Sequence, residues 1–452
     1  MKRGFLKRPT GAPSALSSKA EPAPTAVKSQ EANRNKENET RTVVDDSDRP
    51  RIKLPYGKVD SDSLLPEEFK PKLPTYEIPA QNANINPDFP LITTQPPILA
   101  GAEWNDVPGG WSECHMYAST KRKIQSSPGF PRELPKAKPD CFRIAETPDK
   151  GLGMFATKPI RFGELIISER PLIFCGLFTS MSAKLPKQLT DQQVIQARLA
   201  NKEGELEAVL ERLPQERQDA YRALFNSHLH DGSGPLMGIM RTNGFGVTIE
   251  PERGAAGTFS AVCEKLSRIN HSCSPNSSRR WSSSSFSMQF YASRDIQAGE
   301  EITIQYAELL STAASRKAEL APYDVICKCD SCMNPTESDI RRQEIQKYKP
   351  ISPDDVMKWA YNRQLPNDYI LGPALKTIDL IRQEGIEAVR PFNWAMFAAT
   401  LCYITFANVQ KAVEFGKIVF TLETIEDPQW DVAHFTSLKG MQGHPLWGLR
   451  KN

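Results

Sequence analysis

At residues 270–276 the chain reads Asn270-His271-Ser272-Cys273-Ser274-Pro275-Asn276, directly after Arg268-Ile269. Taken alone, such a stretch is typical of a turn that holds a core histidine. Residues 327–332 read Cys327-Lys328-Cys329-Asp330-Ser331-Cys332 and place three thiols within six positions. Three thiolates are one short of a closed tetrahedral zinc site, and Cys273 is the best candidate for the fourth ligand. The alternative is a set of unrelated free thiols on a loop, but a CxCxxC cluster in a reducing compartment favours the metal.

Two further motifs lie in the strand-rich part of the chain, one before and one after residues 270–276. Residues 151–156 read Gly151-Leu152-Gly153-Met154-Phe155-Ala156, and residues 298–306 read Ala298-Gly299-Glu300-Glu301-Ile302-Thr303-Ile304-Gln305-Tyr306. A lone GxG is usually a turn, but glycines also let the backbone approach a ligand closely, here the charged end of a cofactor. An alternating strand that ends in tyrosine is by itself most often part of a core.

The hydrophobic pattern predicts a core of strands, interrupted by a helical insert and followed by a helical domain. Apolar runs of strand length, with glycines and prolines between them, occupy 141–144, 164–169, 286–291 and 301–306. Residues 189–229 have apolar side chains at helical spacing, punctuated by Gly204 and Pro214. Three helices of the C-terminal region are predicted at 369–382, 394–407 and 412–422.

The composition narrows the class of protein. The chain has 452 residues, which suggests more than one domain, and its net charge of +3 argues against a dedicated nucleic-acid binder. No stretch approaches the ~20 apolar residues that cross a bilayer, and the basic N-terminus lacks the apolar region of a secretory signal. A mitochondrial presequence is the alternative for this basic segment, but its prolines would break the required helix. An odd number of cysteines, 9, favours reduced thiols in the nucleus or cytosol.

In this order, the four motifs resemble those of the SET domain of protein lysine methyltransferases. Residues 151–155 are similar to its opening motif, 270–276 to its NHSCxPN motif, 299–306 to its GEExxxxY motif and 327–332 to its post-SET zinc segment. The helical insert and helical C-terminal domain resemble the SET and MYND family. The MYND zinc finger is missing, because only Cys114, Cys141 and Cys175 precede the second half of the domain, and Cys114-His115 is interpreted as a chance pair.

The resemblance implies an α+β, SET-type fold of small β-sheets with a helical insert, a post-SET zinc site and a helical C-terminal domain. The expected regions are a disordered or extended Pro-rich N-terminus at 1–100, a linker packing on the core at 101–140, the SET domain at 141–306 with its insert at about 178–240, the post-SET zinc segment at 307–335 and the helical domain at 336–452. Residues 1–55 have too few apolar side chains to offset the entropy of ordering.

The resemblance also implies methyl transfer from S-adenosylmethionine to a lysine side chain. Tyr306 is then the catalytic residue and also borders the cofactor. The other implied cofactor-binding residues are Gly151, Leu152, Gly153, Met154, Asn243, Asn270 and His271. Tyr323 is implied as an aromatic of the substrate channel, and one structural zinc is implied with Cys273, Cys327, Cys329 and Cys332 as its ligands.

The implied partner is a histone or non-histone protein, or a peptide, that presents a lysine to a monomeric enzyme in the nucleus, the cytoplasm or both. No membrane and no direct nucleic-acid binding is expected. Two other functions stay open: a SET-fold protein that binds without catalysis, and a zinc-dependent nucleic-acid or chromatin adaptor. The intact Tyr306, Asn270 and His271 argue against the first, and the near-neutral charge argues against the second. A cofactor titration separates both from an enzyme.

Overall fold

The computed structural model describes residues 85–176, 189–426 and 433–451, and three small β-sheets form its centre. The strands are β1 Pro90–Gln95, β2 Ser112–Tyr117, β3 Phe142–Thr147, β4 Gly151–Ala156, β5 Leu165–Glu169, β6 Ile173–Gly176, β7 Phe245–Thr248, β8 Thr258–Val262, β9 Asn270–His271, β10 Ser277–Ser282, β11 Ser287–Ala292 and β12 Glu301–Ile304.

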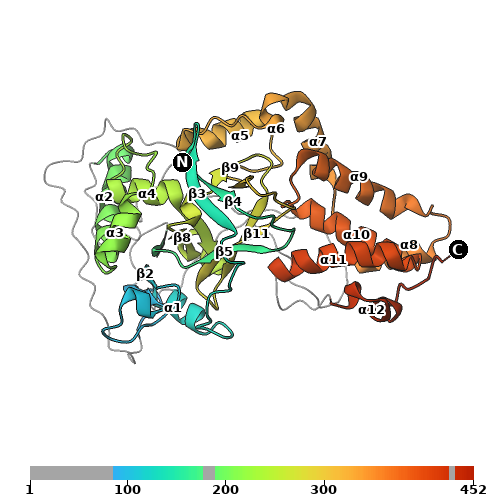
Figure 1. The fold of residues 1–452 in the computed structure, drawn as a ribbon, viewed down its shortest axis with the longest axis horizontal. Coiled ribbons are helices and arrows are strands. Elements are labelled where there is room, and N and C mark those ends of the chain that lie inside the picture. Colours follow the sequence, from blue (N-terminus) through green and yellow to red (C-terminus); the bar gives the residue numbers. More distant parts are fainter. Residues whose placement is uncertain (1–84, 177–188, 427–432, 452) are drawn as a thin grey trace, which may run out of the picture.

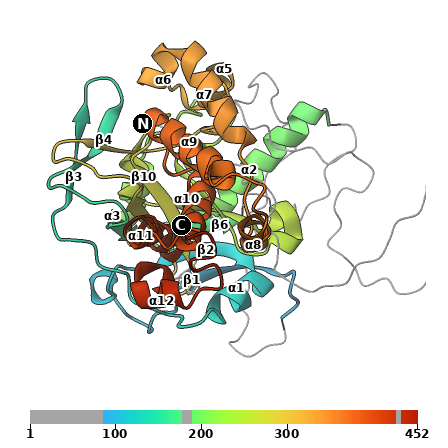
Figure 2. The same ribbon diagram turned by 90° about the vertical axis from the view of Figure 1, so that its right-hand side faces the viewer.

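Helices flank these sheets on several sides. The α-helices are α1 Ala118–Gln125, α2 Asp191–Leu210, α3 Gln215–Arg222, α4 Pro235–Asn243, α5 Ala313–Leu320, α6 Asp330–Met333, α7 Pro335–Lys347, α8 Pro353–Tyr361, α9 Asp368–Glu384, α10 Arg390–Thr405, α11 Val409–Glu426 and α12 Leu438–Gln442. Figure 1 shows the insert helices α2–α4 at one end, the helices α8–α11 at the other, and the strands between them. Helices α5–α7 run along the upper edge in this view and in the perpendicular view of Figure 2.

The five-stranded sheet, in the order β1-β2-β6-β8-β7, is covered on both faces. Side chains alternate between the two faces of a strand, so neighbours on β6 join different cores. Phe174 packs in the core shared with the other sheets, whereas Ile173 and Cys175 pack against the insert helices. The sheet therefore separates the insert from the remainder of the strand core.

The four-stranded sheet, in the order β3-β4-β12-β9, brings three of the four sequence motifs together. Strand β12 runs antiparallel to β4, with Ile302 opposite Met154, and parallel to β9, with Ile304 opposite His271. The third sheet, β10-β11-β5, completes the strand core. Residues separated by more than a hundred positions thus become neighbours in one sheet.

The C-terminal helices have a core of their own. Buried side chains of α8–α11, among them Trp359, Ile378 and Ala399, pack together there, and the guanidinium of Arg450 lies 4.3 Å from the ring centre of Trp359. The three helices predicted at 369–382, 394–407 and 412–422 are confirmed as α9, α10 and α11. No helix among the described residues is both long enough and apolar enough to cross a membrane.

The α+β class is confirmed, and the four predicted strand runs correspond to β3, β5, β11 and β12. Two details differ from the sequence analysis. Gly204 lies inside α2 and does not interrupt it, because the neighbouring turns pack against the five-stranded sheet. Residues 101–140, expected as a linker, contain β2, which pairs with both β1 and β6. Residues 1–84, for which disorder or extended chain is predicted, lie outside the described residues.

Candidate functional site

The four cysteines predicted as zinc ligands converge on one point. Cys273 follows β9, while Cys327, Cys329 and Cys332 lie on the segment that leads into and forms α6. Their Sγ atoms all lie within 4.8 Å of one another. The Sγ of Cys273 is 3.8 Å from that of Cys327 and 3.5 Å from that of Cys332. A tetrahedral zinc ion with Zn–S distances of ~2.3 Å holds its sulfurs about 3.8 Å apart. The arrangement therefore fits a closed four-sulfur zinc site.

A buried arginine lies beside this cluster. Arg316 of α5 is fully buried, and its Nη1 donates a hydrogen bond to the carbonyl of Ser311. Burial alone would lower the pKa of Arg316, but the sulfurs of Cys273 and Cys332 outweigh it and raise that pKa. The Nε and Nη2 atoms meet no acceptor with hydrogen-bond geometry, so the attraction to the sulfurs is electrostatic. Four thiolates around zinc carry a net negative charge, which this guanidinium offsets.

His271 connects the cysteine cluster to Tyr306. The backbone N–H of Tyr306 donates to Nδ1 of His271 at 2.9 Å, and Nε2 of the same ring lies 3.2 Å from the Sγ of Cys273. A backbone N–H can only donate, so Nδ1 is the acceptor and the ring proton sits on Nε2, facing sulfur. Burial lowers the pKa of His271 to about 3, which keeps the ring neutral. Both ring nitrogens are therefore used within the protein.

Tyr306 and Tyr323 form a buried aromatic corner. The hydroxyl of Tyr306 donates to the carbonyl of Ile269 at 2.7 Å. The ring of Tyr323, in a short 3-10 turn after α5, meets the ring of Tyr306 edge to face at 5.9 Å between centroids. Only 3% of Tyr306 and 2% of Tyr323 is exposed. The structure thus places together the two tyrosines that the sequence assigns to catalysis and to the channel.

The glycine motif forms strand β4, against Asn270. The side-chain amide of Asn270 donates to the carbonyl of Leu152 at 3.2 Å and to Oε1 of Glu301 at 2.7 Å. A Cβ on Gly153 would lie 2.9 Å from that Glu301 oxygen and 3.1 Å from the Asn270 amide nitrogen. Gly153 therefore leaves room for the close approach of Asn270, and Gly151, with φ of 70°, opens the strand.

The side chain of Asn276, the second asparagine of the 270–276 motif, bonds to strand β12. Its amide nitrogen donates to the carbonyl of Glu301 at 2.8 Å, and its Oδ1 accepts from the backbone N–H of Thr303 at 2.8 Å. Asn276 thereby pairs with β12 in place of a neighbouring strand. This ties the loop that carries Cys273 to the strand that leads to Tyr306.

Two predicted cofactor residues have structural contacts that limit their role. Met154 is fully buried in the strand core, so only its main chain could reach a ligand. Asn243, at the end of α4, donates both amide hydrogens to backbone carbonyls, at 2.7 Å to Phe225 and at 2.9 Å to Ile239. These bonds fix the end of α4, and they leave only the side-chain oxygen of Asn243 for a cofactor.

Sequence reasoning missed Glu301 and Arg316. Glu301 lies inside the 299–306 motif but reads there as an ordinary strand residue. Its carboxylate accepts from Asn270 and also pairs with the ammonium of Lys150 at 2.7 Å. Arg316 is one of many arginines in a helical stretch. Only the three-dimensional approach to the cysteines distinguishes it.

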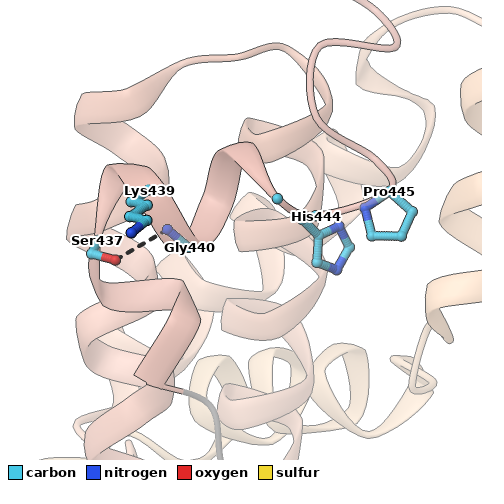
Figure 3. Close-up of a pocket in the computed structure, with 6 residues that line it drawn as sticks. Ser437, Lys439, Gly440, His444 and Pro445 are labelled. Atoms are coloured by element: carbon cyan, nitrogen blue, oxygen red, sulfur yellow. Dashed lines mark hydrogen bonds between the residues drawn. The ribbon is translucent and has the colours of Figure 1, made fainter.

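A separate open pocket of about 500 Å³ lies in the C-terminal region (Figure 3), lined by Ser437, Lys439, Gly440, Gly443, His444 and Pro445. The Nδ1 of His444 accepts from the backbone N–H of Leu446, and Ser437 caps α12. None of the residues predicted from the sequence lines this pocket. The assignment of the functional site therefore depends on the side chains around Tyr306 and not on the size of a cavity.

Comparison with known proteins identifies the same part of the chain. Residues 151–307 match the family described as SET domain. The chain is similar to the histone-lysine N-methyltransferase set5 of Schizosaccharomyces pombe, with 31% identity over 46% of this chain and 57% of that protein. It is also similar to the N-lysine methyltransferase SMYD2-B of Danio rerio, with 28% identity over 32% of this chain and 35% of that protein.

The match thus spans little more than half of the first of these curated relatives. Among solved structures, a SET domain of LSMT bound to lysine and AdoHcy matches with 15% identity over 73% of this chain and 88% of that chain, at a TM-score of 0.27, which is too low to bear on the fold. The family match covers β4 through Tyr306, the segment whose strands assemble the site described above. Residues 151–307 are thus the part of the chain that is similar to SET domains.

Proposed function

We propose that this chain is an S-adenosylmethionine-dependent protein-lysine N-methyltransferase with one structural zinc ion. The observation that carries the proposal is the placement of Tyr306. Its hydroxyl is fixed by the carbonyl of Ile269, its ring faces Tyr323, and the strand that ends two residues before it, β12, adjoins β4 and Asn270. The names of both relatives, which record lysine methyltransferases, support the same activity.

The groups around Asn270 suit the amino-acid end of the cofactor, which carries an ammonium and a carboxylate. The main chain of β4, the amide of Asn270 and the partly exposed carboxylate of Glu301 lie together there. The side-chain oxygen of Asn270, whose amide hydrogens are both donated, the Glu301 carboxylate and the main chain of β4 would hold the cofactor. His271 would contribute through its main chain, because both ring nitrogens already have partners. The four sulfurs would hold zinc with no position open for water, so the metal is structural.

The residues of this chain would then prepare the attacking amine. When bound, S-adenosylmethionine supplies an electrophilic methyl group. Free lysine has a pKa of about 10.4, and the buried surroundings of Tyr306 and Tyr323 disfavour its charged form. Because the Tyr306 proton is donated to Ile269, the phenol oxygen can accept an N–H of the neutral amine and fix its direction of attack. The Tyr306 oxygen would thereby align the amine nitrogen with the methyl group that the cofactor would supply.

The proposed substrate is a lysine on a histone or another protein. The relative's name, a histone-lysine N-methyltransferase, makes histones the first to test. The same name supports a location in the nucleus, the cytoplasm or both. A monomer without direct nucleic-acid binding stays a prediction from the sequence.

The test combines binding and transfer with the full chain. Calorimetric titration with S-adenosylmethionine should show one site, and labelled cofactor should transfer its methyl group to lysines of histones or of proteins in a cell extract. Binding without transfer to any protein would favour the non-catalytic alternative. No binding at all would exclude the enzyme.

A further inference from the structure

The carboxylate of Glu384, the last residue of α9, is buried at the centre of a polar cluster. The Glu384 cluster comprises Ser331, Ser338, Arg341, Arg342 and Glu384. The Nε of Arg342 donates to Oε2 of Glu384 at 2.8 Å, and the hydroxyl of Ser338 donates to the same oxygen at 2.7 Å. The Nε of Arg341 donates to Oε1 at 2.6 Å. Burial raises the pKa of Glu384, but these hydrogen bonds outweigh it and hold that pKa below its usual range.

This cluster contacts the metal segment and the 270–276 motif directly. The Nη2 of Arg342 donates to the carbonyl of Cys273 at 3.0 Å and to the hydroxyl of Ser331 at 2.9 Å, one residue before Cys332. The Nη1 of Arg342 donates to the carbonyl of Leu309, beyond β12. One fully buried guanidinium thus joins α7 to three segments of the SET and post-SET regions.

Ser274 of the 270–276 motif caps the C-terminal end of helix α9. The hydroxyl of Ser274 donates to the backbone carbonyl of Glu384 at 2.6 Å, which satisfies one of the carbonyls left open at a helix C-terminus. The following residue, Gly385, has φ of 62°, and a Cβ there would lie 3.4 Å from the Cβ of Ser274. Ser274, the residue after the proposed ligand Cys273, therefore packs against and bonds to the end of α9.

From Cys273 the contacts continue to the proposed catalytic residue. Cys273 is held at its carbonyl by Arg342, and its sulfur faces Nε2 of His271 at 3.2 Å. Nδ1 of His271 accepts from the backbone of Tyr306. A continuous series of hydrogen bonds and covalent links therefore runs from Glu384 to Tyr306 by way of the metal ligand.

We propose that Arg342 and Glu384 are positioning residues through which the C-terminal helical domain controls retention of the metal and the placement of Tyr306. This inference rests on the zinc ion of the proposed function, and not on methyl transfer. A salt bridge that only docked the helical domain would end on side chains of neighbouring helices. Here the guanidinium ends on the main chain of a metal ligand, and outer contacts of this kind tune metal affinity about 10–100-fold.

The experiment compares two buried carboxylates in the full, zinc-loaded chain. Glu384→Gln removes the only negative charge of the Glu384 cluster. Glu205→Gln does the same to a carboxylate of α2 that is equally buried and pairs with Lys202 at 3.0 Å, away from the cysteines. Transfer of zinc to a chromophoric chelator is timed for each variant at the same interval below its own unfolding midpoint. We expect Glu384→Gln to release zinc about ten-fold faster than the wild type and Glu205→Gln to match the wild type.

Replacing zinc with cobalt gives an absorption spectrum that reports the sulfur geometry. This spectrum should change in Glu384→Gln and stay unchanged in Glu205→Gln. If Glu384→Gln fails to fold, Ser338→Ala removes one hydrogen bond from the same oxygen, and its zinc release should still exceed that of the wild type. Equal release from both carboxylate variants, or unchanged release from Ser338→Ala, overturns the coupling. A wild-type chain without zinc overturns the metal assignment itself and leaves the methyl-transfer proposal to its own test.

Discussion

Two buried salt-bridge clusters attach helices to the strand core, one at each end of the molecule, and they differ in what they touch. The Glu205 cluster comprises His115, Asn201, Lys202 and Glu205. It joins α2 of the insert to β2, with the carboxylate 3.0 Å from the Lys202 ammonium and 3.3 Å from Nδ1 of His115. The Glu384 cluster joins α7 and α9 to the loop of Cys273.

Because the two clusters contact different residues, burial and charge alone do not indicate a functional role. Each cluster holds a carboxylate whose pKa lies below its usual range, despite burial. Only the Glu384 cluster contacts residues that adjoin the metal ligands and, through them, His271 and Tyr306. Changes in the Glu205 cluster should therefore alter stability alone, whereas changes in the Glu384 cluster should also alter the chemistry of the site. The following predictions test this division.

The largest effect is expected from Cys329→Ser. Zinc content should fall from one ion per chain to almost none, because a structural site contributes about 10–16 kcal/mol only with its full ligand set. Metal analysis of the purified protein checks this. Cys402→Ser is the matched control, because Cys402 is fully buried in the C-terminal core and takes no part in the cluster. An unchanged zinc content in Cys329→Ser would remove the metal assignment.

Tyr306→Phe should lower methyl transfer by about 10²–10³, because the oxygen that orients the amine is lost. Its structural control is Tyr221→Phe on the insert side. Tyr221 is fully buried, and its hydroxyl donates to the carbonyl of Leu236 at 2.9 Å, as Tyr306 does to Ile269. Each change removes a buried hydrogen bond from a hydroxyl to a carbonyl, so each should cost about 1–3 kcal/mol of unfolding free energy.

Thermal unfolding and methyl transfer, measured on both variants, separate the two roles. Full activity in Tyr306→Phe with a loss of stability equal to that of Tyr221→Phe would make Tyr306 an ordinary core residue.

Part of the fold and of the candidate site could be predicted from local sequence patterns. Three cysteines could be assigned as ligands because thiols in a CxCxxC spacing have few other uses in a reducing compartment. Cys273 was the best candidate for the fourth ligand, and the structure places all four together. Strands with strict alternation and helices with long apolar faces were likewise predictable. Local patterns carry this information, so no knowledge of distant contacts is needed.

The residues that sequence reasoning missed depend on distant contacts. Arg342 and Glu384 are 42 positions apart, and neither stands in a motif. The sequence predicts residues 101–140 as a linker that packs on the core and does not predict strand β2 within it, because pairing with a strand sixty residues away leaves no local signal. The resemblance implies Met154 as a cofactor residue, and the alternation of β4 turns its side chain into the core, which leaves its main chain for a ligand.

A smaller effect, on stability alone, is expected at the insert when the pH falls. Hydrogen bonds and charges from Lys202 and His115 lower the pKa of Glu205 to about 2 against the opposing effect of burial, from an ordinary value of 4.5. A carboxylate with a lowered pKa stabilises the folded state above pH 4.5, and this contribution is lost as the pH falls toward 2. The loss amounts to about 3 kcal/mol at most.

Urea unfolding at pH 7, 4.5 and 3 checks this prediction. The unfolding free energy of the wild type should fall more steeply with pH than that of Glu205→Gln, which has no carboxylate to protonate. Parallel slopes would show that Glu205 does not stabilise the insert through its charge.

The smallest effect is expected from Gly153→Ala, where the change adds a single methyl group at the junction of β4 and β9. That Cβ would lie 2.8 Å from the Thr147 methyl group and about as close to the Glu301 and Asn270 side chains. These side chains must shift to make room, but none of the three contacts is with backbone, so the cost in stability should stay near 1 kcal/mol. The displacement of Asn270 should nevertheless weaken S-adenosylmethionine binding a few-fold.

Gly372→Ala in α9 is the control, because its Cβ would make only an ordinary contact of 3.7 Å with Asp368 and alanine favours helix. Calorimetric titration of both variants decides the point: if Gly153→Ala binds the cofactor as tightly as Gly372→Ala, Asn270 is a strand-packing residue and the cofactor lies elsewhere.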